Sequence, residues 1–177
     1  YVLPKALVPL GKKSMLEEII ESFIVYGCKR FFISVNYKAE MIENYIRESQ
    51  NNRYYADFIK EPMPLGTAGS LSIIKNKISS TFFVINCDIL IKDDYSAILE
   101  YHRNNRNDLT IISALKHIEF PYGVIETKDN GVLDSISEKP NFTFQINSGM
   151  YILEPHLLDE IPENKLFHMT DLIKILI

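Results

Sequence analysis

Apolar residues recur along this chain with the spacing of helices and of strands in turn. Between residues 14 and 27 they recur every three or four positions, which predicts a helix. Its buried face would hold Leu16, Ile19, Ile20, Phe23 and Ile24. Ser14 and Glu17 form a capping-box pattern at the start of this helix, and Gly27 is a suitable stop. The continuous apolar run Phe31–Val35 that follows predicts a buried strand.

The same alternation continues to residue 115. Further strands are expected at Tyr54–Lys60, Phe82–Asn86 and Leu109–Leu115, and further helices at Ala39–Glu48, Thr67–Lys75 and Asp94–Asn105. Repeated strand–helix–strand units favour a mainly parallel sheet, because the crossover helices then cover both of its faces. The sequence therefore predicts a mixed α/β fold with helices on both sides of the sheet.

The alternation of predicted strands and helices gives way to a series of short strands at Gly123. Short strands are expected at Gly123–Thr127, Val132–Lys139 and Gln145–Leu153, and Asp129-Asn130-Gly131 is a turn between the first two. Such strands predict antiparallel additions to the sheet toward the C-terminal half of the chain. A last helical pattern begins at Asp171.

Composition narrows the class of protein. The 177 residues are 46% hydrophobic and 24% charged, which is typical of one globular domain and excludes a disordered or low-complexity chain. The formal net charge is −4 and the aromatic residues follow the core periodicity, so we expect no nucleic-acid partner. The apolar runs are much shorter than the ~20 residues of a membrane span, so no membrane partner is expected. With only two cysteines, Cys28 and Cys87, a reducing, cytoplasmic location is expected.

Polar residues that directly follow strands are the candidates for chemistry, because ligands of open α/β sheets bind at the carboxyl ends of the strands. Asp88 comes just after the apolar strand ending at Asn86 and could hold a hard cation such as Mg²⁺. The alternative is that Asp88 caps the following turn. The segment Glu61–Gly69 follows the strand ending at Lys60, and Thr67 could cap a helix whose first amides face a ligand. The alternative is an ordinary proline- and glycine-containing loop.

Two lysines are further candidates. Lys139 lies in Glu138-Lys139-Pro140 at the end of a predicted strand, where Glu138 could accept from sugar hydroxyls and Lys139 could neutralise a phosphate. Lys5 follows Pro4 near the start of the chain and could serve a polyphosphate. For both, the alternative is an exposed, solvated side chain.

Taken together, these segments resemble the sugar-1-phosphate nucleotidyltransferase family over essentially the whole chain. They come in the family's order, as Leu3–Ala6, Val8–Gly11, Met15–Leu16, Glu61–Gly69, Asn86–Asp88, Tyr122–Val124, Glu138–Pro140 and Asn147–Gly149. Each segment is weak alone, but all of them in order are specific. Ser34–Glu40 is most similar to bacterial mannose-1-phosphate guanylyltransferase-like members. The resemblance implies a Rossmann-like sheet and an enzyme that makes nucleotide sugars for cell-surface glycans.

The resemblance also implies roles for individual residues. Lys5 would contact the phosphates of the nucleotide, and Asp88 would bind Mg²⁺. The base and ribose would be held by Glu61 and by the loop Leu65, Gly66, Thr67, Ala68 and Gly69. The sugar phosphate would be held by Gly123, Glu138, Lys139 and Asn147, with Lys139 on its phosphate group. Lys5, Asp88 and Lys139 would be the catalytic residues.

The chain departs from the family pattern at four points. The glycine-rich phosphate loop is expected just before Tyr1, and a second metal-binding aspartate is expected downstream of the chain. Cys87 replaces a usual glycine, and Ser14 replaces a usual proline. We therefore expect residues 1–177 to be a single catalytic domain that lacks its N-terminal phosphate loop and its C-terminal end.

The implied reaction is attack by a sugar 1-phosphate on the α-phosphorus of a nucleoside triphosphate, with loss of pyrophosphate. Glu61 favours GTP, because a carboxylate only accepts hydrogen bonds and guanine offers two adjacent donors. Alternatives are a uridylyl-, thymidylyl- or cytidylyltransferase on the same fold, or a non-catalytic nucleotide-sugar-binding regulatory module. A metal-dependent glycosyltransferase would favour Asp-x-Asp, whereas the sequence has Asp88-Ile89-Leu90. Family members often form homo-oligomers, although the sequence has no interface signature.

Overall fold

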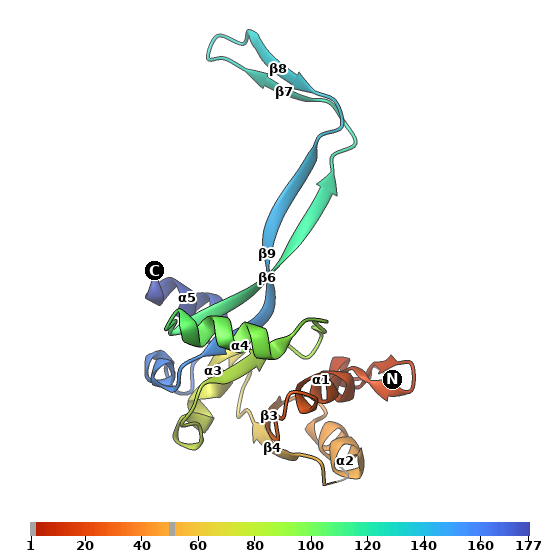
Figure 1. Ribbon diagram of the computed structural model, residues 1–177, viewed down its shortest axis with the longest axis vertical. Helices are drawn as coiled ribbons and strands as arrows, with labels where there is room; N and C mark the ends of the chain where they lie inside the picture. Colours follow the sequence, from red (N-terminus) through yellow and green to blue (C-terminus); the bar gives the residue numbers. More distant parts are fainter. Residues whose placement is uncertain (1–2, 50–51) are drawn as a thin grey trace. The chain divides into compact units, whose positions relative to one another are not determined.

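The computed structural model describes residues 3–49 and 52–177, and it divides into two compact units (Figure 1). Unit 1 comprises residues 1–110 and 150–177, and unit 2 comprises residues 111–149. Unit 2 includes Gly123, where the sequence pattern changes. No helix among the described residues is long and apolar enough to cross a bilayer.

Unit 1 begins with short elements and a capped helix. The 3-10 helix η1 (Lys5–Leu7) leads into the paired strands β1 (Pro9–Leu10) and β2 (Lys13–Ser14), and helix α1 spans Met15–Ile24. The predicted capping box is confirmed: the Glu17 amide donates to Ser14 Oγ over 3.2 Å, and the Ser14 amide donates to Glu17 Oε2 over 2.9 Å.

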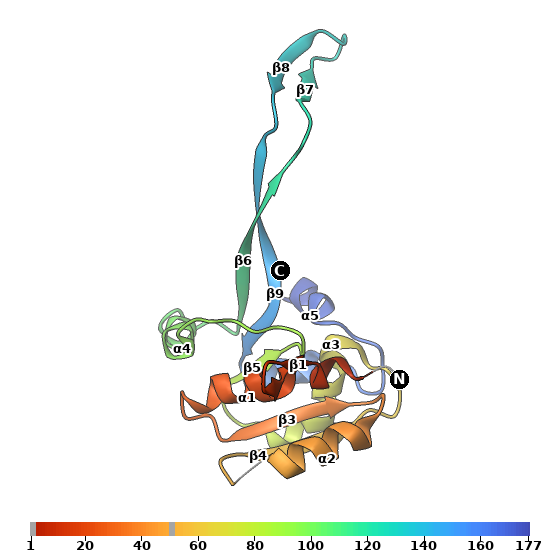
Figure 2. The same ribbon diagram turned by 90° about the vertical axis from the view of Figure 1, so that its right-hand side faces the viewer.

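A parallel strand pair follows. Strand β3 (Arg30–Val35) pairs in register with β4 (Tyr55–Lys60), so that Arg30 faces Tyr55 and Val35 faces Lys60. The crossover between them contains helix α2 (Ala39–Ser49), as Figure 2 shows. Because the strands are parallel, their carboxyl ends lie at one edge, where Glu61 follows β4.

Helices cover both faces of this pair. Phe31, Ile33 and Val35 alternate onto the face that packs with α1 and α2. Phe32 and Ile59 lie in the core cluster formed by the elements that come later in the chain. The α/β class with helices on both faces is thus confirmed.

The rest of unit 1 completes that second core cluster. Its elements are α3 (Gly66–Gly69), the 3-10 helix η2 (Ser70–Lys77), β5 (Phe82–Ile85), α4 (Tyr95–Asn104), the 3-10 helix η3 (Pro155–Glu160) and α5 (Met169–Leu176). The helix predicted over Thr67–Lys75 is divided into α3 and η2. Gly69 and Ser70 are weak helix formers. The Ser72 hydroxyl also donates to the Gly69 carbonyl over 2.7 Å, where it competes with the backbone hydrogen bonds of a regular α-helix.

Two long strands connect the units. Strand β6 spans Leu109–Glu119 and strand β9 spans Asn141–Leu153, and both are longer than their predicted counterparts. The sheet order is β5-β9-β6, and β9 runs antiparallel to β5, with Phe82 opposite Leu153. The alternation of strands and helices in the sequence predicts a mainly parallel sheet. The structure has less parallel pairing than this, because β9 runs back from unit 2 and pairs antiparallel with β5.

Within the part of unit 1 that the structure describes, strands β3 and β5 each have one unpaired edge. Among the described strands, β3 is hydrogen-bonded to β4 and to no other, and β5 is hydrogen-bonded to β9 alone. Helix α1 touches both through Phe23, whose ring lies 6.4 Å from the Phe31 ring and 5.3 Å from the Phe83 ring, centre to centre. Strands β3 and β5 thus both pack against α1.

Unit 2 is a β-ribbon. Strand β7 (Val124–Thr127) pairs antiparallel with β8 (Leu133–Ser137), as the sequence predicts for this region. The turn between them contains Gly131 at φ +77°, and its amide donates to the Lys128 carbonyl at 2.8 Å. Ile125 and Ile136 face each other across the ribbon, and both are exposed.

Candidate nucleotide and phosphate site

Lys5 and Asp88 are brought together although 82 residues separate them in the sequence. Lys5 begins η1, Asp88 lies in the turn after β5, and the Lys5 Nζ to Asp88 Oδ2 distance is 3.7 Å. Their side chains are 79% and 50% exposed, so this pair contributes little to stability and is free to rearrange around a ligand. Within the described residues Asp88 accepts no hydrogen bond, and the turn is closed instead by the Ile89 amide on the Asn86 carbonyl.

Asp88 fits a magnesium ion that takes most of its ligands from elsewhere. In the described part of the chain no three histidine, cysteine or acidic side chains gather as a metal cage. Mg²⁺ is commonly held by one or two carboxylates together with water and substrate phosphates, which suits a single exposed aspartate. The neighbouring Cys87 is unsuited to be a ligand, because Mg²⁺ prefers oxygen donors.

The Glu61 carboxylate is held in place by two donors. The Ser34 hydroxyl donates to Glu61 Oε1 over 2.5 Å, and the Leu65 amide donates to Oε2 over 3.0 Å. The Glu61 amide itself donates to the Val35 carbonyl over 3.2 Å, which continues the β3–β4 ladder by one residue. Glu61 is therefore fixed at the carboxyl edge of the β3–β4 pair, and it ties this edge to the loop that follows.

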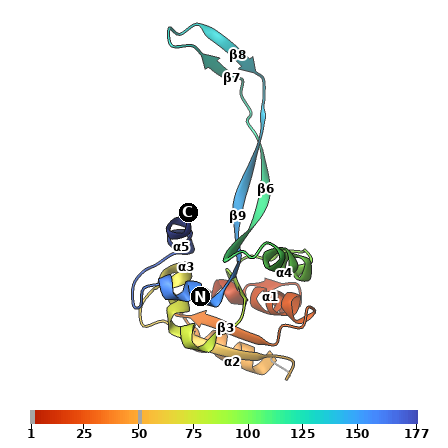
Figure 3. The same ribbon diagram turned by 60° about the vertical axis from the view of Figure 1, so that its left-hand side comes forward.

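The loop Leu65–Gly69 is docked onto residues 165–169, which precede and begin α5 (Figure 3). The Ala68 and Gly69 amides both donate to the Phe167 carbonyl, at 3.1 and 3.0 Å, and the Phe167 amide donates to the Leu65 carbonyl at 2.9 Å. The Thr67 amide donates to His168 Nδ1 over 3.4 Å, so the amides of Thr67, Ala68 and Gly69 are all engaged by protein. The prediction that the first amides of this helix face a ligand is corrected for these three residues.

The prediction that Thr67 caps this helix is also wrong. Leu65 occupies the N-cap position, and Thr67 lies inside the helix, where its hydroxyl accepts from the Met169 amide at 2.9 Å. Thr67 therefore connects the loop to α5. Local sequence gives no signal for this contact, because the two residues are about a hundred positions apart.

The two glycines of the loop are required by close packing. Gly66 has φ +80°, and a Cβ there would lie 2.7 Å from the Phe167 carbonyl oxygen. A Cβ at Gly69 would lie 2.9 Å from the Lys165 carbonyl oxygen. The docked backbone alone thus accounts for glycine at both positions.

Unit 2 contains the four residues predicted for the sugar phosphate. It brings Gly123 against Glu138, since a Cβ on Gly123 would lie 2.9 Å from Glu138 Oε2. Lys139 follows with φ 45°, in the left-handed region, and its side chain is exposed. Asn147 accepts from the Gly149 amide at 3.0 Å through Oδ1. Unit 2 therefore presents a carboxylate and an ammonium from consecutive residues of one strand end.

A family model described as nucleotidyl transferase matches residues 1–175. The chain belongs to this family. It is 31% identical over 164 residues to the mannose-1-phosphate guanylyltransferase catalytic subunit beta of Drosophila pseudoobscura pseudoobscura, a match covering 89% of the chain and 44% of the relative. It is 35% identical over 166 residues to the mannose-1-phosphate guanyltransferase of Yarrowia lipolytica, covering 90% and 46%. The chain thus spans less than half the length of these relatives.

A solved structure is also similar to this chain. The chain is similar to HddC from Yersinia pseudotuberculosis complexed with GMP-PN, with a TM-score of 0.72 and 29% identity. The match covers 94% of the chain and 73% of HddC. The Rossmann-like class expected from the sequence is consistent with this likeness.

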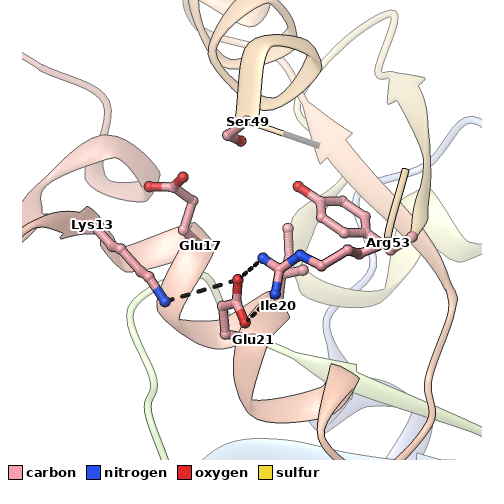
Figure 4. A pocket seen from close by; sticks show the side chains of 7 residues that line it. Lys13, Glu17, Ile20, Glu21, Ser49 and Arg53 are labelled. Carbon is pink, nitrogen blue, oxygen red and sulfur yellow. Dashed lines mark hydrogen bonds and ion pairs between the residues drawn. The ribbon is translucent and has the colours of Figure 1, made fainter. Parts of the chain in front are cut away.

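One cavity in unit 1 is lined by none of the predicted site residues. It has a volume of about 170 Å³ and lies between α1 and the segment around Arg53 (Figure 4). Its two cations, Lys13 and Arg53, both pair with Glu21, and the carboxylates of Glu17 and Glu21 together balance their charge. The cavity therefore offers no excess positive charge for a phosphate, and we assign the candidate site to the strand ends.

Proposed function

We propose that this chain carries the catalytic centre of an enzyme that joins a sugar 1-phosphate to GTP. A phosphate oxygen of the sugar 1-phosphate would attack the α-phosphorus of GTP, and the bond from that phosphorus to the β-phosphate oxygen would break. The products are a GDP-sugar and pyrophosphate. The observation that carries this proposal is the Lys5–Asp88 pair, which brings a cation from η1 to an exposed carboxylate in the turn after β5. The family and the names of the relatives support it.

The chemistry requires local positive charge rather than a general base. The attacking oxygen is already anionic, so the main barrier is the approach of two polyanions. Two like charges 4 Å apart repel by about 1 kcal/mol in water and about 4 kcal/mol at an effective dielectric constant near 20. A protein with net charge −4 has to offset this with placed cations, which we propose are Lys5 for the nucleotide and Lys139 for the sugar phosphate.

Asp88 would hold Mg²⁺, and this ion, when bound, would neutralise phosphate charge and orient the reacting groups. Gly123, Glu138 and Asn147 would bind the sugar phosphate together with Lys139. The loop Leu65–Gly69 would form one wall for the base and ribose, and the docked segment at Phe167 would hold that wall rigid. The free cysteines Cys28 and Cys87 are in keeping with a cytoplasmic enzyme.

Glu61 would select the base. Its two oxygens would accept from N1–H and the 2-amino group of guanine, whereas uracil and thymine present one N–H between two carbonyl acceptors. An unpaired carboxylate oxygen facing a carbonyl would cost about 1–3 kcal/mol. This difference favours GTP over the pyrimidine nucleotides.

The test is pyrophosphate release with mannose 1-phosphate, Mg²⁺ and each of GTP, ATP, UTP, dTTP and CTP. We expect GTP to be preferred. Asp88→Asn should lower turnover at least 100-fold while the circular dichroism spectrum is unchanged, because Asp88 is the carboxylate that residues 1–177 contribute to the proposed metal site. Asp129→Asn, in the exposed turn of unit 2, is the matched control and should retain activity.

Three outcomes would contradict the proposal or part of it. Near-normal turnover of Asp88→Asn would remove this residue from the metal site. Nucleotide binding by the unaltered protein without any pyrophosphate release would favour the non-catalytic binding module instead. A clear preference for UTP or dTTP would replace GTP by a pyrimidine nucleotide.

A further inference from the structure

Ser34 contacts the proposed base-reading group from the neighbouring strand. It lies one residue before the end of β3, opposite Ile59, and its exposed side chain reaches past the end of β4 to Glu61. The Ser34 Oγ to Glu61 Oε1 distance of 2.5 Å is at the short end for a hydroxyl–carboxylate bond, as expected for a charge-assisted one. This contact depends on the β3–β4 register, since a shift of one residue would turn Ser34 to the opposite face.

The two donors on Glu61 leave a defined acceptor pair. A carboxylate has about four lone-pair sites, two on each oxygen. Ser34 uses one site on Oε1 and the Leu65 amide uses one on Oε2, so each oxygen keeps one site. One donor on each oxygen also fixes the plane of the carboxylate. The remaining sites then match two adjacent donors presented in that plane.

We propose that Ser34 is a positioning residue for nucleotide selection: it orients the Glu61 carboxylate so that both oxygens can accept from one purine edge. This inference rests on the proposed function, because it takes Glu61 as the group that reads the base. Ser34 itself touches no substrate. Without its hydroxyl, Oε1 loses its fixed partner and the carboxylate can turn about the bond to the side chain, held by the Leu65 amide alone.

The consequence is specific to substrate binding and to base discrimination. Ser34→Ala should weaken GTP binding about tenfold and raise the KM for GTP by a similar factor, as expected for one hydrogen bond to a charged group. The kcat should change less than about twofold, because the reacting phosphates are not contacted. The preference for GTP over UTP should fall, whereas Ser34→Thr, which keeps the hydroxyl, should restore it.

The chain contains a matched control. Ser135 donates to Glu126 Oε2 over 2.9 Å, so it too is an exposed serine bonded to a glutamate on a neighbouring strand. Ser135→Ala should leave every nucleotide constant unchanged. Thermal unfolding of both alanine variants measures any loss of folding, and calorimetric titration with GTP measures binding without requiring turnover.

The outcomes separate the two proposals. If the unaltered protein binds GTP and releases pyrophosphate but Ser34→Ala matches Ser135→Ala in GTP binding and in GTP-to-UTP preference, Ser34 has no positioning role and the proposed function stands. Equal losses for GTP and UTP would indicate a purely structural role and would also overturn the inference. If the unaltered protein neither binds GTP nor releases pyrophosphate, the proposed function fails and this inference fails with it.

Discussion

At the scale of single residues, the proposed site depends on how many hydrogen-bond acceptor positions of each carboxylate are not already used by protein donors. Asp88 accepts no hydrogen bond within the described residues and has a lysine nearby, whereas Glu61 is held by Ser34 and Leu65. A carboxylate without fixed partners suits a metal ion, whose ligands rearrange with the substrate. A fixed carboxylate suits recognition, because its geometry exists before the ligand arrives.

The role of Glu61 predicts the effect of an amide in its place. Glu61→Gln should lower kcat/KM for GTP by about 10- to 100-fold and raise the relative rate with UTP, because an amide pairs one donor with one acceptor. Steady-state pyrophosphate release with each nucleotide measures both changes. An unchanged ratio of GTP to UTP would show that Glu61 does not read the base.

At the scale of elements, the docking of α3 onto the start of α5 is the contact that organises the loop. Gly66 is the position where the two backbones come closest. Gly66→Ala should destabilise the protein by about 1–3 kcal/mol or more, because the new Cβ meets the Phe167 carbonyl and the φ of +80° is strained. Urea unfolding measures this change.

Gly131→Ala separates the two causes. Gly131 has a similar φ of +77°, but a Cβ there would meet no atom within 4 Å. Gly131→Ala should therefore lower the free energy of unfolding through backbone strain alone, without a steric clash. Equal destabilisation by both variants would mean that the contact with Phe167 adds nothing.

The sequence predicts elements better than it predicts the contacts between them. The capping box at Ser14, the β3 and β4 strands and the helix predicted over Asp94–Asn105 follow from local patterns, and the structure confirms them. The Thr67 cap is wrong because Met169 offers a competing donor from far along the chain. The Ser34–Glu61 contact needs the strand register, which local periodicity leaves open.

At the scale of the whole of unit 1, a buried polar network connects elements from across the sequence. His102 of α4 is 1% exposed, and its ring nitrogens lie 2.8 Å from Thr110 Oγ1 and 3.2 Å from Glu154 Oε1. Thr81, just before β5, donates to the same Glu154 oxygen over 2.7 Å. Glu154 therefore links α4 and the approach to β5 with the end of β9.

This network predicts how stability depends on pH. Burial alone would raise the pKa of Glu154, but hydrogen bonds from Thr81 and His102 outweigh it and lower the pKa below its usual value. A carboxyl group whose pKa is lowered by folding stabilises the protein above its unfolded pKa of ~4.3 and loses this contribution as the pH falls through the folded value.

The melting temperature of the unaltered protein should therefore fall more steeply as the pH is lowered below about 5 than that of Glu154→Gln. The variant should be the less stable of the two at pH 7, and the difference should shrink in acid. Other carboxyl groups with lowered pKa values, such as Glu17 and Glu21, also contribute to the pH dependence of stability. Their contribution is the same in both proteins and cancels in the comparison. Parallel pH profiles would contradict this role of Glu154.

The open edges of β3 and β5 also bear on how the protein behaves during preparation. An unpaired strand edge rich in phenylalanine and isoleucine is a template for any extended backbone, including that of another molecule still folding. During refolding from denaturant, the rate of this association rises with the square of the protein concentration. The rate of productive folding rises only in proportion to it. The yield of refolded protein should therefore drop as its concentration rises, and refolding at high dilution should restore it.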